Sequence, residues 1–403
     1  MERQAGAPPR TGSMIVSQKN SSPRLHDGAL LATVLAGTWR EEPPPPAIAA
    51  EQLSRLAPLL IGSGTAGFVW RSMSRDAALK AAEGASELRN AHHHFAIQAS
   101  VKGESLDALA TEFSAAGLEP LVFKGWAIAR YYTAPHLRPF GDFDLCAPPG
   151  RHAEAAALLG KHISGTLRHD NQGLVHLPNN FQVEMSSGLA ATVDLHADLK
   201  KYRCPSLAAV YGRSIPVRLS GGTVRVPALE DHLRLAILHF LRHGGWRPLW
   251  LTDIAAMLES ATGDFNWDLC LGEEPHVRRW IACILQLAGD LLGARIEHVP
   301  TSSRIADMPR WIAKTVLNEW RAPFAARQAV RPLGDAIADP RLFPGELVQR
   351  WPNAIRATAD RDGPFDASTR LPYQLASFTA SAWGRVARTF AGPAATLVED
   401  DKV

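Results

Sequence analysis

The stretch RPFGDFDLCA, residues 138–147, carries two aspartates, Asp142 and Asp144, one residue apart within an apolar run. In an extended strand, residues two apart point to the same face, so both carboxylates project together. Two like charges placed side by side repel each other unless a cation or a basic partner lies between them. A turn is the alternative, because Gly141 and Asp142 also form a typical turn dipeptide. If the strand forms, the fold must bring a cation or a basic side chain to this pair.

The pattern of apolar residues changes from helical to strand-like at Leu118. Before this point, apolar residues recur at three- and four-residue steps, as on one face of a long helix or a helix pair: Leu88, Ala91, Phe95, Leu106, Leu109 and Phe113. After it come the short apolar runs EPLVFKG, DFDLCAP, GLVHL, FQVEM and ATVDLHADL, with two helical segments, WAIARYY and RHAEAAALLGKH. We therefore expect an α+β fold with an α/β core, a small mixed sheet carrying two helices, flanked by helical regions at both ends.

The chain divides into five predicted segments. Residues 1–27 are rich in Pro, Gly, Ser and Gln, so we expect them to be disordered. In EDHLRLAILHFLRH, residues 230–243, apolar residues follow the i, i+3, i+4, i+7 rule of an amphipathic helix. The segments after the first are an N-terminal helical region (28–117), the core with the sheet (118–229), a helical region that closes a cleft (230–300) and a helical C-terminal extension (301–403).

Charge and composition argue against several classes of protein. Lys and Arg number 43 against 40 for Asp and Glu, and this formal charge of +3 is too small to predict a nucleic acid partner. No apolar run approaches the ~20 residues that a membrane helix needs. The four cysteines show no C-x-x-C spacing, which argues against a zinc site or a disulfide framework. We expect a cytoplasmic protein without a membrane partner.

A third acidic residue, Asp194, lies in the alternating run ATVDLHADL, where it shares a face with His196. Two carboxylates on one strand and a third on a neighbouring strand can hold a pair of divalent ions, which prefer oxygen ligands. Such ion pairs activate the attacking oxygen and stabilise the leaving one in phosphoryl or nucleotidyl transfer. For Asp194 alone, the alternative is an edge-strand charge that faces water.

The segment LVFKGWAIARYY places Lys124 and Gly125 between a strand and the start of a helix. A glycine at such a turn lets a phosphate approach backbone N–H groups at the positive end of the helix. Lys124 can neutralise a triphosphate, and Arg138 can bind one through two parallel hydrogen bonds. Each basic residue alone also fits an ordinary surface charge. The order of strand, glycine turn, helix, D-x-D strand and acidic strand is the stronger signal.

This order resembles the nucleotidyltransferase superfamily that includes DNA polymerase beta, and more closely its family of uncharacterised bacterial nucleotidyltransferases. The resemblance covers roughly residues 28–293 and includes LRNAHHHFAIQ before the core and PALEDHLRLAILHFLRHGGWRPLWLTDIAAML after it. Within the core, the matching residues are Lys124-Gly125, Tyr131 or Tyr132, Arg138, Asp142-Phe143-Asp144-Leu145 and Val193-Asp194-Leu195-His196.

The resemblance implies a catalytic site at residues 118–229. Asp142 and Asp144 would hold two Mg²⁺ ions, with Mn²⁺ as an alternative, and Asp194 would share one ion and help deprotonate the acceptor hydroxyl. Lys124, Gly125 and Arg138 would bind the NTP donor. A nucleoside monophosphate would then pass to a hydroxyl or phosphate of a small molecule, a peptide or a protein.

One departure from the superfamily pattern concerns the glycine turn. The superfamily usually has Gly-Ser there, with a serine hydroxyl on the phosphate, whereas this chain has Gly125-Trp126. Tryptophan cannot make that contact. A catalytically degenerate nucleotidyltransferase fold that binds nucleotide or a partner is therefore the alternative function.

The histidines His232, His239 and His243 lie within a narrow arc of one predicted helix. His239 and His243 have the spacing of a zinc pair, but HFLRH lacks the glutamate of H-E-x-x-H. We expect this stripe to face the cleft on the acceptor side, with a hydrogen-bonded helix face as the alternative. His196 is either a partner that orients a metal ligand or an ordinary buried histidine. A phosphohydrolase built on the stripe is a weaker third function.

Overall fold

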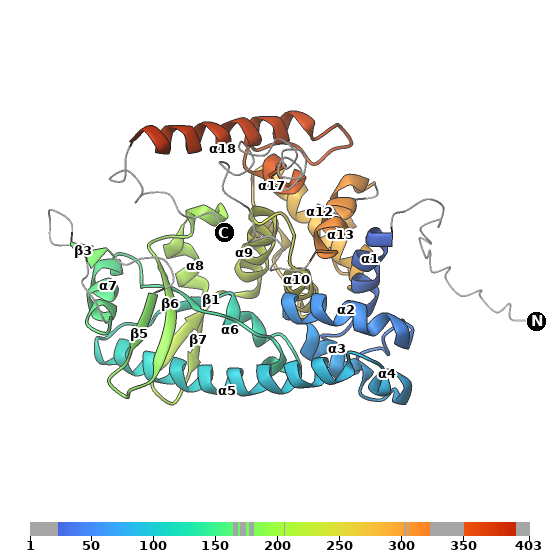
Figure 1. The fold of residues 1–403 in the computed structure, drawn as a ribbon. Coiled ribbons are helices and arrows are strands. Elements are labelled where there is room, and N and C mark those ends of the chain that lie inside the picture. Colours follow the sequence, from blue (N-terminus) through green and yellow to red (C-terminus); the bar gives the residue numbers. More distant parts are fainter. Residues whose placement is uncertain are drawn as a thin grey trace, which may run out of the picture.

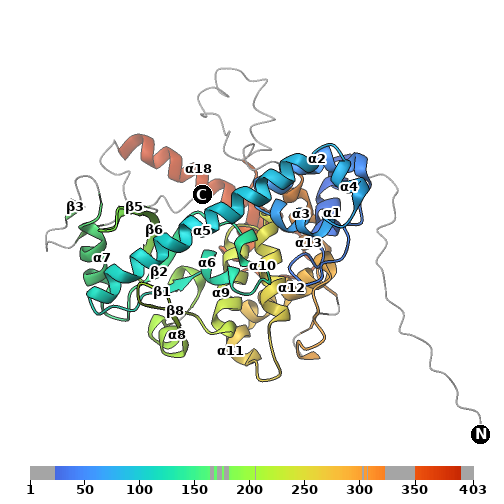
Figure 2. The same ribbon diagram turned by 90° about the horizontal axis from the view of Figure 1, so that it is seen from below.

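The computed structural model describes residues 23–163, 168–169, 175–176, 181–204, 206–301, 304–305, 307–322 and 350–391. Within this part of the chain, a six-stranded mixed sheet lies beside a larger helical region. The helix α5 (Ala85–Ala115) runs along both, as Figure 1 and the view from below in Figure 2 show. The predicted α+β fold, a mixed sheet flanked by helical regions, is confirmed.

The N-terminal helices pack around the first half of α5, where α3 makes the most extensive contact. Helix α1 begins at Pro23, inside the predicted segment 1–27, whose disorder stays a prediction. The Asp27 carboxylate, 2.8 Å from the Arg55 guanidinium, ties the first turns of α1 to the next helix. Residues 1–22 lie outside the described part. The bounds are α1 (Pro23–Leu35), α2 (Ala50–Ser63), α3 (Ala66–Met73) and α4 (Ala77–Ala81).

The sheet has the strand order β5-β6-β2-β1-β8-β7. Strand β2 pairs in parallel with β6, and the register sets Asp144 opposite Asp194 and Cys146 opposite His196. Strand β1 is antiparallel to β2 and parallel to β8. The bounds are β1 (Leu121–Phe123), β2 (Phe143–Cys146), β5 (Phe181–Glu184), β6 (Ala190–His196), β7 (Ile215–Arg218) and β8 (Thr223–Val226).

The hairpin of β7 and β8 is absent from the strands that the sequence predicted. Pro216 lies inside β7 and cannot donate to a ladder, which argues against a strand in a sequence reading. The structure accommodates it because β7 is the edge strand of the sheet. The hairpin matters for the site because β8 covers the open side of β1.

Short elements connect the strands. The predicted strand GLVHL lies in part outside the described residues, and its described part belongs to a separate two-stranded sheet. The predicted helices WAIARYY and RHAEAAALLGKH correspond to α6 and α7. The bounds are α6 (Gly125–Ala129), the 3-10 helix η1 (Pro135–Leu137), α7 (His152–Gly160), β3 (Arg168–His169), β4 (Val175–His176), the 3-10 helix η2 (Lys200–Tyr202) and α8 (Leu207–Arg213).

The helices after the sheet pack together on the side of the molecule that faces the ends of β2 and β6. Helix α9 buries its apolar face against α10, α11 and α12, and the amphipathic pattern predicted for residues 230–243 accounts for this packing. Among the described residues, no helix is both long enough and apolar enough to cross a membrane. The bounds are α9 (Leu229–Arg242), α10 (Pro248–Glu259), α11 (Trp267–Leu271), α12 (Pro275–Leu292), α13 (Arg310–Trp320), α17 (Ala354–Ala359) and α18 (Leu371–Ala391).

Two hydrophobic cores share α5. Leu88 and Phe95, in its first half, belong to the large helical core. Leu106 and Phe113, in its second half, belong to the core between α5 and the sheet. The division of the chain into five segments stays a prediction. Helix α5 lies in the predicted segment 28–117, and its second half packs against the sheet of the segment 118–229.

Candidate active site

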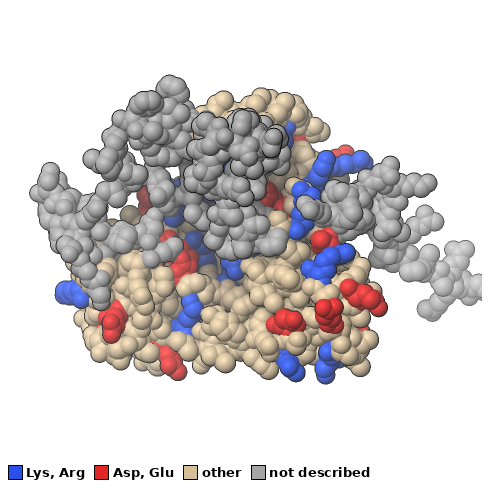
Figure 3. All heavy atoms as spheres, in the orientation of Figure 1, with Lys and Arg blue, Asp and Glu red and all other residues tan. Residues whose placement is uncertain are grey.

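A pocket of about 420 Å³ opens between the ends of β2 and β6 and the helices α9 and α10. It collects most of the side chains that the sequence singled out, and Figure 3 shows basic and acidic side chains together in the hollow at the middle of this face. Of the predicted site residues, those that line it are Lys124, Gly125, Arg138, Asp142, Asp144, Asp194, His239 and His243. His196 does not line the pocket and instead contacts two of its carboxylates.

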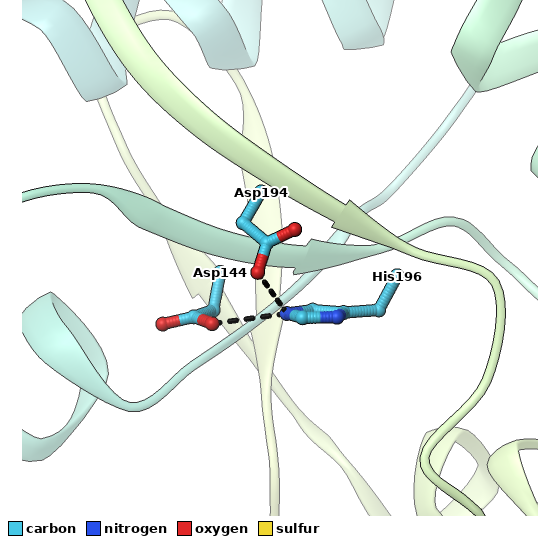
Figure 4. Close-up of side chains that lie close together, drawn as sticks. All are labelled: Asp144, Asp194 and His196. Atoms are coloured by element: carbon cyan, nitrogen blue, oxygen red, sulfur yellow. Dashed lines mark hydrogen bonds and ion pairs between the residues drawn. The ribbon is translucent and has the colours of Figure 1, made fainter. Parts of the chain in front are cut away.

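The parallel pairing of β2 and β6 brings Asp144, Asp194 and His196 together (Figure 4). The His196 Nε2 atom lies 2.9 Å from Asp144 Oδ1 and 3.1 Å from Asp194 Oδ2. Because carboxylate oxygens accept, this geometry requires a proton on Nε2. One ligand atom from each of the three residues falls within 4.8 Å of the others. His196 is therefore a direct partner of both acidic residues.

Lys124 supplies a positive partner to Asp144. Its ammonium contacts Asp144 Oδ1, and both side chains are largely buried. Burial lowers the pKa of Lys124, but the Asp144 carboxylate and the Tyr202 hydroxyl outweigh it, so the net pKa lies above the ordinary value. Lys124 is therefore charged at neutral pH and offsets part of the carboxylate charge.

The backbone of Lys124 is strained. Its φ of 56° and ψ of −144° lie in a region that favours glycine. The Lys124 N–H donates to His232 Nε2 at 3.2 Å, and the Lys124 carbonyl accepts from Ile128 N at 2.8 Å. These bonds, with the ion pair to Asp144, hold the turn that begins α6. Strain of this kind persists where surrounding contacts over-determine the conformation, and it concentrates at functional sites.

The three carboxylates are not equivalent. Burial and the neighbouring Asp144 charge raise the pKa of Asp142. Burial also acts to raise the pKa of Asp144, but Lys124 and His196 reverse the effect and the net pKa is lowered. At Asp194, burial again acts to raise the pKa, but the hydrogen bond and the charge interaction with His196 outweigh it, so the net pKa is lowered. Asp142 lies on the pocket wall outside the cluster of Asp144, Asp194 and His196, so its predicted role as a metal ligand stays a prediction.

Arg138 makes a buried ion pair that the sequence did not predict. Its Nε and Nη2 donate to Asp253 Oδ1 and Oδ2 at 2.8 and 2.7 Å, and the Tyr132 hydroxyl donates to Asp253 Oδ1 at 2.7 Å. The Arg138 and Asp253 side chains are only 5% and 2% exposed. We expected Arg138 to donate two parallel hydrogen bonds to a phosphate. In the structure, Arg138 donates them to Asp253 of α10. Its nucleotide-binding role stays a prediction.

The histidine stripe divides between two places. His239 and His243 line the pocket and pack against Trp250, with ring centroids 4.7 and 5.1 Å away, while His232 lies behind the pocket at the Lys124 turn. Burial, with smaller effects from Lys124 and other basic groups, lowers the pKa of His243 to about 3 and that of His239 well below its ordinary value. At neutral pH, this part of the pocket is an uncharged aromatic wall.

The glycine turn is tightly packed. A Cβ at Gly125 would lie 3.3 Å from the Asp142 carbonyl oxygen and 3.3 Å from Phe140 Cβ. Trp126, where the superfamily pattern has serine, packs partly buried against the core beneath the sheet. The turn therefore offers no hydroxyl at this position, as the sequence indicated.

The donor set fits a divalent cation. Asp144 and Asp194 provide carboxylate oxygens, and Asp142 lies on the adjoining wall. His196 offers a ring nitrogen to the same point only once Nε2 has lost the proton that it donates to the two aspartates. Oxygen-rich sites suit Mg²⁺ and Mn²⁺, and an imidazole is tolerated better by the transition metal. Lys124 compensates part of the same negative charge that a cation would neutralise.

Comparisons with known proteins indicate the family of this chain. The family model described as uncharacterised nucleotidyltransferase matches residues 49–293. The chain matches no curated protein. The crystal structure of an antigenic nucleotidyltransferase-like protein from Paracoccidioides brasiliensis is 18% identical and covers 48% of this chain and 92% of its own, but its TM-score of 0.36 is too low to carry an argument. On the family match, which spans more than half of its length, the chain belongs to the uncharacterised nucleotidyltransferase family.

Proposed function

We propose that this protein transfers a nucleoside monophosphate from an NTP to a hydroxyl or phosphate acceptor, with two Mg²⁺ or Mn²⁺ ions as cofactors. The observation that carries the proposal is the parallel register of β2 and β6, which sets Asp144 beside Asp194 at the mouth of a pocket that also contains Asp142 and Lys124. Membership in the superfamily that includes DNA polymerase beta is part of the same proposal.

Asp142, Asp144 and Asp194 would hold the metal ions. When bound, divalent ions stabilise charge on the transferring phosphoryl group and lower the pKa of an oxygen nucleophile. In the transfer, a bond forms between the acceptor oxygen and the α-phosphorus of the NTP, and the bond from that phosphorus to pyrophosphate breaks. For a hydroxyl acceptor, the displaced proton passes to Asp194.

The chain's own residues orient these groups. His196 contacts Asp194 through Oδ2, so Oδ1 is the oxygen that accepts the proton. Lys124 is charged and buried beside Asp144, where it neutralises phosphate oxygens of the donor. The strained turn at Lys124 is held by the hydrogen bond to His232, and it fixes the position of the Lys124 ammonium in the pocket. His239, His243 and Trp250 present an uncharged surface to the acceptor side.

Calorimetry tests the donor half of this proposal. We expect NTPs to bind wild type in the presence of Mg²⁺ and the Asp144→Asn variant to lose this binding by more than ~100-fold, because replacing even a group behind a metal ligand costs about 10- to 100-fold. Asp198→Asn is the matched control. Its carboxylate follows β6, is 43% exposed and does not line the pocket, so its affinity should equal that of wild type. Metal-independent binding in all three proteins would overturn the proposal.

The tryptophan at the turn favours one second candidate, a fold that binds nucleotide without chemistry. Release of pyrophosphate from the NTP, measured with and without a panel of hydroxyl and phosphate acceptors, distinguishes the two. Turnover that is lost in Asp144→Asn and retained in Asp198→Asn supports transfer. Mg²⁺-dependent binding with no pyrophosphate released from any donor and acceptor pair supports the binding protein.

A further inference from the structure

Arg247 is a basic residue of the pocket that the proposed function has not used. It immediately precedes α10 and lines the same cavity as Asp142 and Gly125. Within the part of the chain that the structure describes, its guanidinium makes one hydrogen bond, from Nε to the carbonyl of Ser63 at 2.9 Å, and no ion pair with a carboxylate. A mostly buried cation without an anionic partner is costly, so its retention calls for a ligand that supplies the missing charge.

The surroundings fix this guanidinium in place. Ser63 is the last residue of α2, whose C-terminal end carries a partial negative charge that stabilises a nearby cation. The following residue, Gly64, has a φ of 83°, and a Cβ there would lie 2.8 Å from Arg247 Nη2. The turn after α2 therefore leaves room for the guanidinium only because it has no side chain at this point.

The acidic residues near Arg247 do not neutralise its charge. Asp253 is neutralised by Arg138 through two short hydrogen bonds. Asp142 is the other acidic neighbour, and a metal ion would neutralise it. Burial, with repulsion from Arg138, lowers the pKa of Arg247 to about 10, so the group is still charged at neutral pH while its charge is poorly stabilised.

We propose that Arg247 binds a phosphate group in this pocket, either the terminal phosphate of the NTP or a phosphate carried by the acceptor. The guanidinium presents planar N–H groups that match phosphate oxygens, and its Nε is already occupied by the protein. Arg247 thereby provides the phosphate contact that the sequence led us to expect from Arg138. The assignment to an NTP rests on the proposed function, whereas the phosphate site itself does not.

Binding of defined probes to Arg247→Gln tests the proposal and separates the two sources. If Arg247 holds the terminal phosphate, Mg²⁺-ATP should bind about 10- to 100-fold more weakly than to wild type, with AMP unchanged, because a charge-assisted hydrogen bond is lost. If it holds an acceptor phosphate, ATP affinity should be unchanged and inorganic phosphate should bind the ATP-loaded variant correspondingly more weakly. Equal affinities for ATP and for phosphate in variant and wild type would overturn it.

Arg71→Gln is the matched control. Arg71 also donates to backbone carbonyls of the helical region, those of Arg40 and Glu41, but it does not line the pocket. Its replacement should leave both affinities unchanged. If it weakens ATP or phosphate binding as much as Arg247→Gln does, loss of structure and not of a phosphate contact explains the result, and the proposal fails.

A measurement on the wild type covers the case in which Arg247→Gln does not fold. Phenylglyoxal modifies accessible arginines, and mass spectrometry reports the rate at each position. Pyrophosphate or Mg²⁺-ATP should protect Arg247 and leave Arg71 unprotected, and equal rates at Arg247 with and without both probes would overturn the proposal. If wild type binds no NTP but pyrophosphate protects Arg247, the proposed function falls and the phosphate site stands.

Discussion

The two walls of the pocket obtain their chemistry in different ways. The sheet wall carries ionised groups, Asp144 and Asp194, whose positions follow from the register of two neighbouring strands. The wall of α9 and α10 carries neutral histidines, tryptophans and two arginines, Arg242 and Arg247, placed by helix packing. On the first wall, the compensating charge comes from Lys124 on the adjoining turn, which pairs with Asp144. On the second, compensation comes from residues more than a hundred positions away, as in the pair of Arg138 and Asp253.

This difference indicates where each wall is vulnerable. The sheet wall can lose one carboxylate and keep its backbone, because the ladder hydrogen bonds do not involve side chains. The helical wall depends on a buried ion pair that also fixes the loop leading to Asp142, so its loss should affect stability before chemistry. The following predictions test this contrast, from the largest effect to the smallest.

Breaking the buried pair should give the largest loss of stability. Asp253→Asn leaves the Arg138 guanidinium buried and without a carboxylate, and such losses cost about 3–5 kcal/mol. Urea unfolding measures the change. The exposed pair of Arg151 and Glu154 serves as the control, and Glu154→Gln, which removes only the charge of this pair, should not change the midpoint measurably. An Asp253→Asn protein as stable as wild type would show that the helical wall does not depend on this pair.

Replacing His196 should weaken metal binding and leave the fold intact. His196→Gln keeps a polar group near Asp144 and Asp194 but loses the ring geometry that orients both, so affinity for Mn²⁺ should fall about 10- to 100-fold. Titration calorimetry with Mn²⁺ measures it. His162→Gln, at a pair with Glu112 outside the pocket, is the control. Unchanged Mn²⁺ affinity in His196→Gln would show that His196 does not contribute to metal binding.

Acid should destabilise the helical wall through its histidines. The pKa of His243 falls from the ordinary 6.5 to about 3 on folding, so between these values the unfolded state binds more protons and stability decreases as pH falls. In His243→Gln, the slope of unfolding free energy against pH between 6 and 4 should be shallower by up to about 1.4 kcal/mol per pH unit. Parallel slopes for variant and wild type would mean that His243 is not held neutral.

A methyl group at the glycine turn should have the smallest effect. Gly125 does not have a positive φ, so alanine can adopt its backbone, and Gly125→Ala should leave Tm unchanged or slightly raised. The new Cβ would press on the Asp142 carbonyl at 3.3 Å and shift that residue slightly. We expect Mg²⁺-NTP affinity to fall a few-fold by calorimetry. A large loss of Tm would show that the turn tolerates no added atom.

Much of the sheet wall could be predicted from the sequence, and little of the helical wall could. Alternation around Asp144 and Asp194 indicated two strands with carboxylates on one face, and the order of elements indicated that these strands share a site. The same alternation put His196 on the face of Asp194. The strand register that lets His196 contact both carboxylates depends on which strands are neighbours, and that is a property of the whole sheet.

The helical wall required contacts between distant residues. Asp253 lies in the apolar helix PLWLTDIAAMLE, and a lone acidic residue in such a helix signals a buried partner without naming it. Arg138 is 115 positions away, and His232 reaches Lys124 across 108. Helical spacing correctly grouped His239 with His243, but it could not show that burial keeps both neutral, because the apolar surroundings come from other helices.

The continuous helix α5 has a consequence for how this protein unfolds. With 31 residues it is about 46 Å long, and its two halves are built into different hydrophobic cores. Neither core can come apart without exposing half of a helix whose other half is still packed. The sheet and the helical region should therefore melt together in a single transition, and hydrogen exchange in the middle of α5 should report the global opening of the molecule.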